Sequence, residues 1–293
     1  MNAPPTAPEI AGRLGLHRSR QGEWRGNCPA CGYKEALVVT QDQGRTLTWC
    51  ASCQDSKAVF QAVRAVVGSD MPPPAPTGPS PADNAARIEK ARHLWAGATP
   101  AENTPAALYL ARRRLPELAA SPALRFRGDT SHPAGGRLPA MLARIDNAAG
   151  ELIAVHRTYL RPDGSKAGVE PVKASLGPVQ GGAIRLAPAG PELVVGEGIE
   201  TAASAGHLIG LPAWAAISAG NLARSLVLPP GVRTVVIAAD HDEPDPRTGR
   251  RPGQEAARAA AWRWRKEGRR VRVALPDRPG VDFNDMLTEA AHG

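Results

Sequence analysis

Two apolar segments that each end in acidic residues decide the fold of this chain: Leu193-Val194-Val195-Gly196-Glu197-Gly198-Ile199-Glu200-Thr201 and Thr234-Val235-Val236-Ile237-Ala238-Ala239-Asp240-His241-Asp242. Continuous β-branched segments of this kind are typical of strands that lie in a parallel sheet and are covered on both faces. Helical and strand patterns alternate around them, at 199–208, 213–217, 253–267 and 270–275. This alternation predicts an α/β fold with a parallel sheet, flanking helices and right-handed crossovers.

Acidic residues come directly after the two predicted strands. Ligands of open α/β sheets bind beyond the carboxyl ends of the strands, so we expect Glu197, Asp240 and Asp242 to face one crevice. Carboxylate oxygens are the ligands that Mg²⁺ prefers, and Mg²⁺ keeps several waters, which leaves room for substrate phosphates. Alternatively, Glu197 begins a helix, where the helix dipole favours acids, and the two aspartates are ordinary loop residues. The occurrence of acids after both strands favours the metal site.

Length and charge limit the class of protein. The chain has 293 residues, enough for two or three domains, and a net charge of +8, which suits a polyanionic partner such as nucleic acid. Arginine-rich codon usage is the alternative explanation of that charge. The N-terminal residues lack a signal-peptide pattern, and no apolar run reaches membrane-spanning length. We therefore expect a cytoplasmic protein without a membrane partner.

The four cysteines form two pairs, Cys28/Cys31 and Cys50/Cys53, with eighteen residues between the pairs. This spacing matches a common zinc pattern, and in a reducing compartment it predicts one closed, tetrahedral, structural zinc site. The alternative is two unliganded or redox-active pairs. Predicted strands at 36–40 and 45–49, joined by a turn at 42–44, indicate a zinc ribbon, followed by a predicted helix at 56–67.

Changes in composition divide the chain into four segments. Residues 1–70 are predicted to be a zinc-ribbon, nucleic-acid-binding domain, and residues 71–82 a proline-rich linker that favours an extended polyproline conformation. Residues 83–190 contain two predicted helices and several strands, as expected of a small basic α+β subdomain. Residues 191–293 form the predicted sheet domain. In the basic subdomain, four cations are candidate contacts for phosphates, or else solvated surface residues: Arg125, Arg127, Arg157 and Lys173.

Taken in this order, the features resemble a DNA primase of the bacterial (Toprim) class, of phage, plasmid or mobile-element type. Glu197 and Asp240-His241-Asp242 match the Toprim pattern, and Asp282-Phe283-Asn284-Asp285 resembles a box that often closes such domains. The cysteine pairs resemble the N-terminal zinc-binding domain of primases, although many relatives have a histidine in place of one cysteine. The chain also lacks a GxxxxGK[ST] loop, so the replicative helicase is expected to be a separate protein.

The resemblance implies a Toprim-like sheet, preceded by a basic α+β subdomain and a zinc ribbon, that makes short RNA primers on single-stranded DNA from nucleoside triphosphates during DNA replication. It implies that Glu197, Asp240 and Asp242 hold Mg²⁺ or Mn²⁺ for nucleotidyl transfer, with Glu197 alternatively a general base. A second tier of acids consists of Glu200, Asp282 and Asp285. Two other functions stay open: a Toprim-type metal-dependent nuclease, and a non-enzymatic single-stranded DNA-binding protein.

Overall fold

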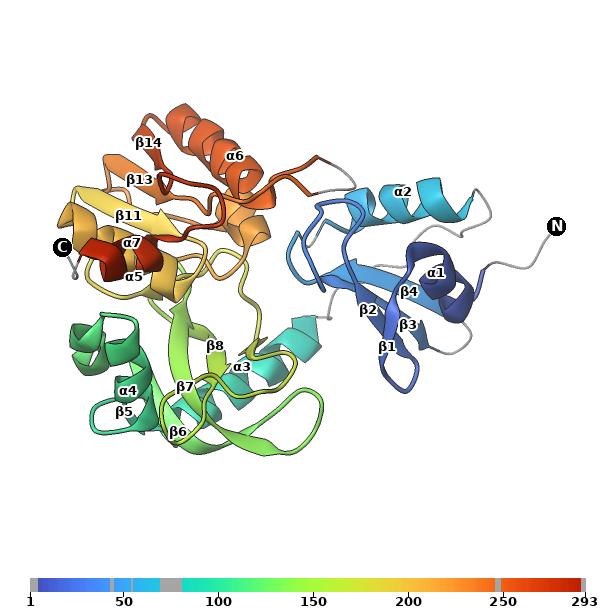
Figure 1. Ribbon diagram of the computed structural model, residues 1–293, viewed down its shortest axis with the longest axis horizontal. Helices are drawn as coiled ribbons and strands as arrows, with labels where there is room; N and C mark the ends of the chain where they lie inside the picture. Colours follow the sequence, from blue (N-terminus) through green and yellow to red (C-terminus); the bar gives the residue numbers. More distant parts are fainter. Residues whose placement is uncertain (1–4, 43–44, 54, 69–80, 246–248, 291–293) are drawn as a thin grey trace. The chain divides into compact units, whose positions relative to one another are not determined.

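The computed structural model describes residues 5–42, 45–53, 55–68, 81–245 and 249–290. The chain separates into two compact units, one of Met1–Pro79 with Pro244–Pro252 and the other of Ser80–Glu243 with Gly253–Gly293. Figure 1 colours both along the sequence. The predicted linker at 71–82 lies outside the described residues up to residue 80. Its last two residues, Pro81 and Ala82, begin helix α3 (Pro81–Ala96).

The first unit contains a four-stranded antiparallel sheet with strand order β1-β2-β3-β4. Its elements are α1 (Ala7–Leu14), β1 (His17–Arg20), β2 (Glu23–Gly26), β3 (Leu37–Asp42), β4 (Arg45–Cys50) and α2 (Ser56–Val67). The Asp55 carboxylate accepts a hydrogen bond of 2.9 Å from the Ala58 N–H and so caps the start of α2. Ile10 of α1 and Val59 of α2 pack with Leu37 of β3 in one small core.

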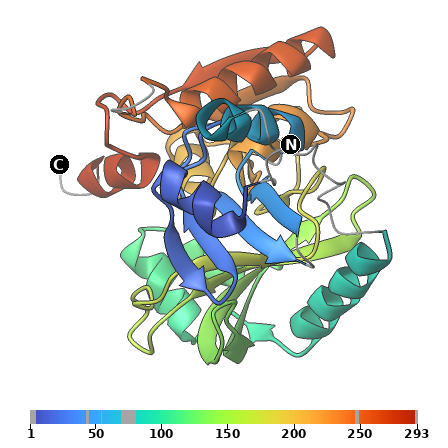
Figure 2. The same ribbon diagram turned by 90° about the vertical axis from the view of Figure 1, so that its right-hand side faces the viewer.

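The second unit begins with a five-stranded antiparallel sheet, in the order β5-β6-β7-β8-β9, which we call the middle sheet. Its elements after α3 are β5 (Thr99–Pro100), α4 (Pro105–Arg112), the 3-10 helix η1 (Pro116–Ala120), β6 (Leu124–Ser131), β7 (Arg137–Asp146), β8 (Leu152–Tyr159) and β9 (Lys173–Leu176). Helix α3 lies against one face of this sheet (Figure 2), where Trp95 packs with Leu142 and Val155. The opposite face carries Met141 and Ile145.

The second sheet of this unit has the order β10-β12-β11-β13-β14, and β10 alone runs antiparallel to its neighbour. Its elements are β10 (Ile184–Arg185), β11 (Glu192–Gly196), α5 (Ile199–Ile209), β12 (Ala213–Ala215), the π-helical turn η2 (Asn221–Ser225), β13 (Thr234–Ala238), α6 (Pro252–Lys266), β14 (Arg270–Ala274) and α7 (Phe283–Ala290). Helices α5 and α7 cover one face and α6 the other (Figure 1). The predicted mixed α/β fold with a mostly parallel sheet is confirmed.

Helix packing follows from small side chains at the central strands. A Cβ atom on Gly196 would lie 2.9 Å from the Ala202 nitrogen, so only glycine lets α5 lie this close to the end of β11. The buried face of α5 joins Val194 to Met141 and Ile145 of the middle sheet in one hydrophobic cluster. The two sheets of this unit therefore share a core. In the described part of the chain, every helix is too short or too polar to cross a membrane.

Candidate active site

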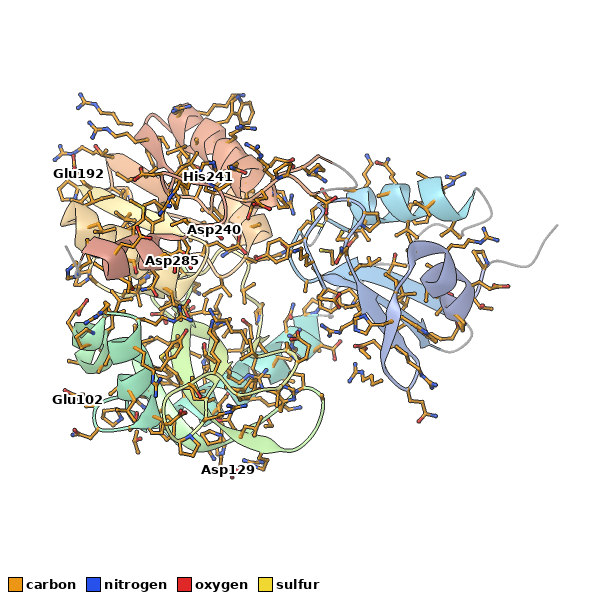
Figure 3. The ribbon with its side chains drawn as sticks, viewed as in Figure 1. Glu102, Asp129, Glu192, Asp240, His241 and Asp285 are labelled. Atoms are coloured by element: carbon orange, nitrogen blue, oxygen red, sulfur yellow. The ribbon has the colours of Figure 1, made fainter. Side chains whose placement is uncertain are left out.

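Two acids leave the parallel sheet at the same edge. Strands β11 and β13 are adjacent and parallel, with Gly196 opposite Ala238, and Glu197 and Asp240 follow these paired positions. Figure 3 shows Asp240 beyond the end of β13, whereas Glu192 marks the start of β11 at the opposite edge. The carboxyl edge of a parallel sheet is the usual ligand-binding edge in α/β folds, and both acids follow strands that end at this edge.

Asp240 has other acidic residues as neighbours. It is half-buried, and its Oδ1 accepts a hydrogen bond of 3.3 Å from the Thr201 hydroxyl of α5. Burial raises the pKa of Asp240, and the charges of Asp242 and then Asp282 raise it further, while the hydrogen bond from Thr201 and the charge of Lys173 act in the opposite direction. Carboxylates that resist ionisation because of neighbouring carboxylates fit a site for a cation.

Asp242 is held by the helix that follows it. Its Oδ2 accepts a hydrogen bond of 2.6 Å from the N–H of Gly253, in the first turn of α6. A Cβ atom on Gly253 would lie 2.8 Å from this oxygen, so a larger residue there would displace the Asp242 carboxylate. Between the two aspartates, Nδ1 of His241 lies 2.7 Å from the Pro276 carbonyl oxygen and ties this segment to the chain after β14. The Asp-x-Asp segment is therefore fixed at each of its three residues.

Glu197 has a fixed backbone. Its carbonyl oxygen accepts a hydrogen bond of 2.7 Å from the N–H of Ile217, which follows β12 at the same edge. Ile217 has φ of +73°, an unfavourable value for a β-branched residue. Such strain persists where the surrounding structure imposes it, and it is frequent at functional sites. Ile217 is a feature of this edge that the sequence pattern did not reveal.

The acids do not converge on a single point. Among the described residues, the four cysteines are the one group of three or more potential ligands that could hold an ion, and Glu197, Asp240 and Asp242 do not form such a group. Asp240 and Asp242 each use one oxygen in the hydrogen bonds above, and each carboxylate has a second oxygen. Mg²⁺ usually takes one or two carboxylates and completes its shell with water and substrate phosphates, so this pair fits it.

Glu200, in the first turn of α5, makes a buried ion pair with Lys173 of β9. The Lys173 Nζ lies 2.9 Å from both carboxylate oxygens, and the Tyr109 hydroxyl of α4 also donates to Oε1. Burial by itself would raise the pKa of Glu200, but the Lys173 charge and the hydrogen bonds from Tyr109 and Lys173 outweigh it and lower that pKa. The structure thus commits both oxygens of Glu200 to protein partners.

Asp282 and Asp285 cap helix α7. The Asp285 N–H donates to Asp282 Oδ1 at 2.8 Å, and the Asp282 N–H donates to Asp285 Oδ2 at 3.0 Å, which is a reciprocal capping box. Between them, the buried Asn284 donates to the Arg113 carbonyl oxygen at 2.6 Å and to the Ser204 hydroxyl at 3.0 Å. The Asp-Phe-Asn-Asp segment therefore positions α7 against α4 and α5.

The arginines of the middle sheet mostly bind the protein's own backbone. Arg125 donates to the Trp95 carbonyl oxygen at 2.9 Å and its guanidinium lies over the Trp95 ring. Arg157 is buried and donates to the carbonyl oxygens of Ser131 and Ala174, at 2.9 and 3.3 Å. Arg127 donates to the Asp129 carbonyl oxygen at 3.1 Å. Of the four predicted phosphate contacts, only Lys173 lies among the acids of the parallel sheet.

Lys166, which the sequence pattern did not single out, belongs to the same charged cluster as Lys173. Burial lowers the pKa of Lys166, and the positive charges of Lys173 and Arg113 lower it further, while Glu200 and Asp282 act in the opposite direction. The cluster therefore brings two lysines from the middle-sheet region near the acids of the parallel sheet. Local spacing gave no signal for this, because Lys166 lies in a turn that is far from those acids in the sequence.

The four cysteines form a compact cluster in the first unit. Their Sγ atoms all lie within 4.8 Å of one another, and those of Cys31 and Cys50 are 3.6 Å apart. None of the four forms a disulfide, and the Cys53 N–H donates to the Cys50 Sγ at 3.3 Å. Thiolates at tetrahedral spacing with N–H···S bonds match a closed, four-coordinate metal site, so the geometry fits the implied ion.

Two segments of the chain match models of known protein families. Residues 192–292 match the Toprim domain family. These residues form a Toprim domain. Residues 85–186, which include the whole of the middle sheet, match a domain of unknown function (DUF7146). No curated protein sequence matches the chain.

The chain is similar to several solved structures at low sequence identity. It is 15% identical to the primase fragment of the bacteriophage T7 primase-helicase protein, with a TM-score of 0.44, covering 91% of this chain and 94% of that one. It is 16% identical to the Escherichia coli primase catalytic core, with a TM-score of 0.46 and coverages of 69% and 75%. It is 18% identical to the RNA polymerase domain of Mycobacterium tuberculosis primase DnaG, with a TM-score of 0.41 and coverages of 70% and 79%.

Proposed function

We propose that this chain is a DNA primase, which synthesises short RNA primers on a single-stranded DNA template from nucleoside triphosphates. The observation that carries the proposal is the meeting of acids and lysines at the carboxyl edge of the Toprim sheet. Thr201 of α5 donates to Asp240 at 3.3 Å, and the adjacent Glu200 lies 2.9 Å from the Lys173 Nζ, so one helical turn contacts both an acid and a lysine. Acids suited to a divalent ion beside cations suited to phosphates are what nucleotidyl transfer needs.

In primer synthesis, the 3′-hydroxyl of one nucleotide attacks the α-phosphate of a triphosphate, a new P–O bond forms, and pyrophosphate leaves with the electrons of the broken bond. Asp240 and Asp242 are the proposed ligands of Mg²⁺ or Mn²⁺, which when bound polarises phosphate oxygens and lowers the charge barrier to attack. Glu197 either completes the ligand set or accepts the hydroxyl proton. Lys173 and Lys166 would bind triphosphate oxygens, and Thr201 keeps Asp240 in place through its hydroxyl.

The first unit is proposed to bind one structural zinc ion through Cys28, Cys31, Cys50 and Cys53. Its small core and the tight thiol cluster support a role of zinc in folding, because four thiolates at this spacing repel one another without a cation. Exposed β1, with two arginines, supports a role in binding single-stranded DNA. A separate replicative helicase would supply the unwound template.

The test is a template-dependent primer assay with purified protein, single-stranded DNA, Mg²⁺ or Mn²⁺ and nucleoside triphosphates. The wild type is expected to make short RNA, and Asp240→Ala to reduce the rate by about a thousandfold or more, because a metal ligand is lost. Glu192→Ala is the matched control, since this exposed acid starts β11 at the opposite edge of the same sheet (Figure 3). Full activity of Asp240→Ala would contradict the proposal.

The same assay separates the two other functions. A Toprim nuclease would degrade a labelled strand with metal alone, without nucleotides, and would lose that activity in Asp240→Ala. A non-enzymatic binding protein would retain its DNA affinity in Asp240→Ala and make no product under any condition. If the wild type degraded the strand with metal alone, the nuclease function would replace the primase assignment. If the wild type bound DNA but made no product, the binding function would replace it.

A further inference from the structure

The first turn of α5 carries two adjacent polar side chains that reach in different directions. Thr201 donates to Asp240, which follows β13, at 3.3 Å. Glu200 binds Lys173 of β9 through both of its oxygens, each 2.9 Å from Nζ. This turn begins two residues after Glu197. A single turn of helix therefore contacts both an acid of the Toprim sheet and a cation of the middle sheet.

The Glu200–Lys173 pair is built to hold the lysine still. The residue Glu200 is 8% exposed, and the Tyr109 hydroxyl of α4 also donates to it. A buried carboxylate with three hydrogen bonds has little freedom, and an ammonium that shares two of its three protons with that carboxylate is restricted as well. The Lys173 side chain remains 31% exposed, so part of it is still open to a ligand.

The positive charge of Lys173 affects the ionisable groups around it. Burial raises the pKa of Asp240 and the positive charge of Lys173 opposes this effect, while the same charge lowers the pKa of Lys166 after the effect of burial. Lys173 therefore acts on both the acids and the second lysine of the cluster. A buried ion pair contributes little net stability compared with apolar residues of equal size, which leaves positioning as the better reason for its presence.

We propose that Glu200 is a positioning residue: with Tyr109 it fixes the Lys173 ammonium where the triphosphate of an incoming nucleotide binds, so Glu200 acts through Lys173 and is not a metal ligand. This inference rests on the proposed primase function. It differs from the sequence-based expectation, which placed Glu200 in a second tier of acids around the metal. It also gives α5 a specific task, since its first turn sets the separation between metal-binding acid and phosphate-binding cation.

The test is a double-mutant cycle on nucleotide affinity, with Glu200→Gln, Lys173→Met and the double variant. The dissociation constant for ATP in Mg²⁺ is measured by equilibrium dialysis, together with KM and kcat of primer synthesis. Glu200→Gln is expected to weaken ATP binding about tenfold and to raise KM more than it lowers kcat. Lys173→Met is expected to weaken binding about a hundredfold, and the double variant no further.

The double variant decides between positioning and a purely structural role. If Glu200 acts through Lys173, removing Glu200 has no further effect once Lys173 is absent. If Glu200 only stabilises the fold, its loss weakens binding by the same factor in both backgrounds, and that additive result would overturn the proposal. A metal role would instead raise the Mg²⁺ concentration needed for half-maximal activity in Glu200→Gln and leave ATP affinity unchanged, which would also overturn it.

Tyr109→Phe keeps the test decisive if Glu200→Gln does not fold. This variant removes one hydrogen bond to Glu200, leaves the ion pair intact, and is expected to weaken ATP binding about threefold in the wild-type background and not in Lys173→Met. Glu192→Gln is the control for the loss of one acid from the same domain, with unchanged ATP affinity. A wild type that makes no primers would refute the proposed function, whereas an active wild type with an additive cycle would refute only the role of Glu200.

Discussion

The two predicted metal sites of this chain differ in how complete they are. In the cysteine cluster, four Sγ atoms lie within 4.8 Å of one another, and they come from two Cys-x-x-Cys segments, the second of which begins at the last residue of β4. In the Toprim domain, Asp240 and Asp242 each have a protein donor on one oxygen, and no such group of ligands forms with Glu197. The chain alone completes the first site. In the second, proposed site, positions would be left for water and substrate, as in catalytic sites.

The same difference appears in the expected contribution of each metal to stability. A closed cysteine site couples ion binding to folding, because the ligands meet only in the folded state. The Toprim aspartates are held by the sheet, and both the partial burial of Asp240 and the neighbouring charge of Asp242 raise the pKa of Asp240, so its ionised form opposes folding when no cation is present. Removing a ligand should therefore destabilise the first site and relieve strain in the second.

The largest expected effect tests whether removing a ligand lowers stability at the cysteine site and raises it at the Toprim site. Cys50→Ser is expected to lose the bound zinc and to unfold the first unit, at a cost of more than about 5 kcal/mol. Asp240→Asn is the matched variant. It is expected to retain one zinc per chain and, without added Mg²⁺ or Mn²⁺, to raise the melting temperature by about 2 °C. Zinc content by a chromogenic chelator, together with thermal unfolding followed by circular dichroism, measures both. Unchanged zinc content and melting in Cys50→Ser would break the comparison.

A second prediction concerns the cationic side of the Toprim site. Burial and the positive charge of Lys173 lower the pKa of His156 from 6.5 to about 3, so between these values the folded protein binds fewer protons than the unfolded chain. The stability associated with neutral His156 is complete above pH 6.5 and is lost as the pH falls towards 3. By pH 5 the loss should reach about 2 kcal/mol relative to His156→Gln.

Urea unfolding at several pH values between 7 and 4.5 measures this difference. The groups near His156 are Lys173, Glu200 and Arg157, and Ser175 lies 3.0 Å from its Nδ1. The exposed His93 of α3 provides the control, because His93→Gln removes a histidine that lies outside the group of charged residues around His156. An equal effect of His156→Gln at pH 7 and pH 5 would show that neither burial nor the Lys173 charge lowers the pKa of His156.

The smallest expected effect tests whether Asp282 caps α7 or binds the metal ion of the Toprim site. Asp282→Ala should cost about 1 kcal/mol because α7 loses its capping oxygen, whereas Asp282→Asn keeps an acceptor and should be nearly neutral. Chemical denaturation of the three proteins measures the difference. If Asp282 were a metal ligand, Asp282→Asn would raise the Mg²⁺ requirement of primer synthesis, so a Mg²⁺ titration of that variant separates the two roles.

The sequence was sufficient for the features that depend on local pattern. The apolar segments ending at Gly196 and Ala238 predicted parallel strands, and the spacing of the cysteine pairs predicted their cluster. Strands β1, β2, β5 and β9 and helix α1 were not predicted. All of them are short, and β1 is fully exposed with the sequence His-Arg-Ser-Arg, so no apolar alternation marks it. Such strands form because a neighbouring strand supplies hydrogen-bonding partners.

For the candidate site, the sequence placed Glu197 and Asp240 at one edge but gave no information on partners between elements. Glu200 and Tyr109 are 91 residues apart, and no local pattern links them. Nor does charge alone show the direction of a side chain. Arg157 was a candidate phosphate contact, yet it is 6% exposed and bonded to backbone carbonyl oxygens. Whether an arginine side chain of the middle sheet is buried depends on which face of the sheet α3 covers, and the sequence does not show this.

The position of Asn284 in the chain has a consequence for protein synthesis. Its amide bonds to the Arg113 carbonyl oxygen, 171 residues earlier in the chain, and to Ser204 of α5. At translation rates of about 5 to 20 residues per second, roughly 10 to 30 s separate the emergence of Arg113 from that of Asn284. During that interval the nascent middle sheet and α5 are without the helix that joins α4 to α5. The packing of α7 against α4 and α5 is therefore a late product of synthesis, although the core shared by the two sheets through α5 does not depend on it.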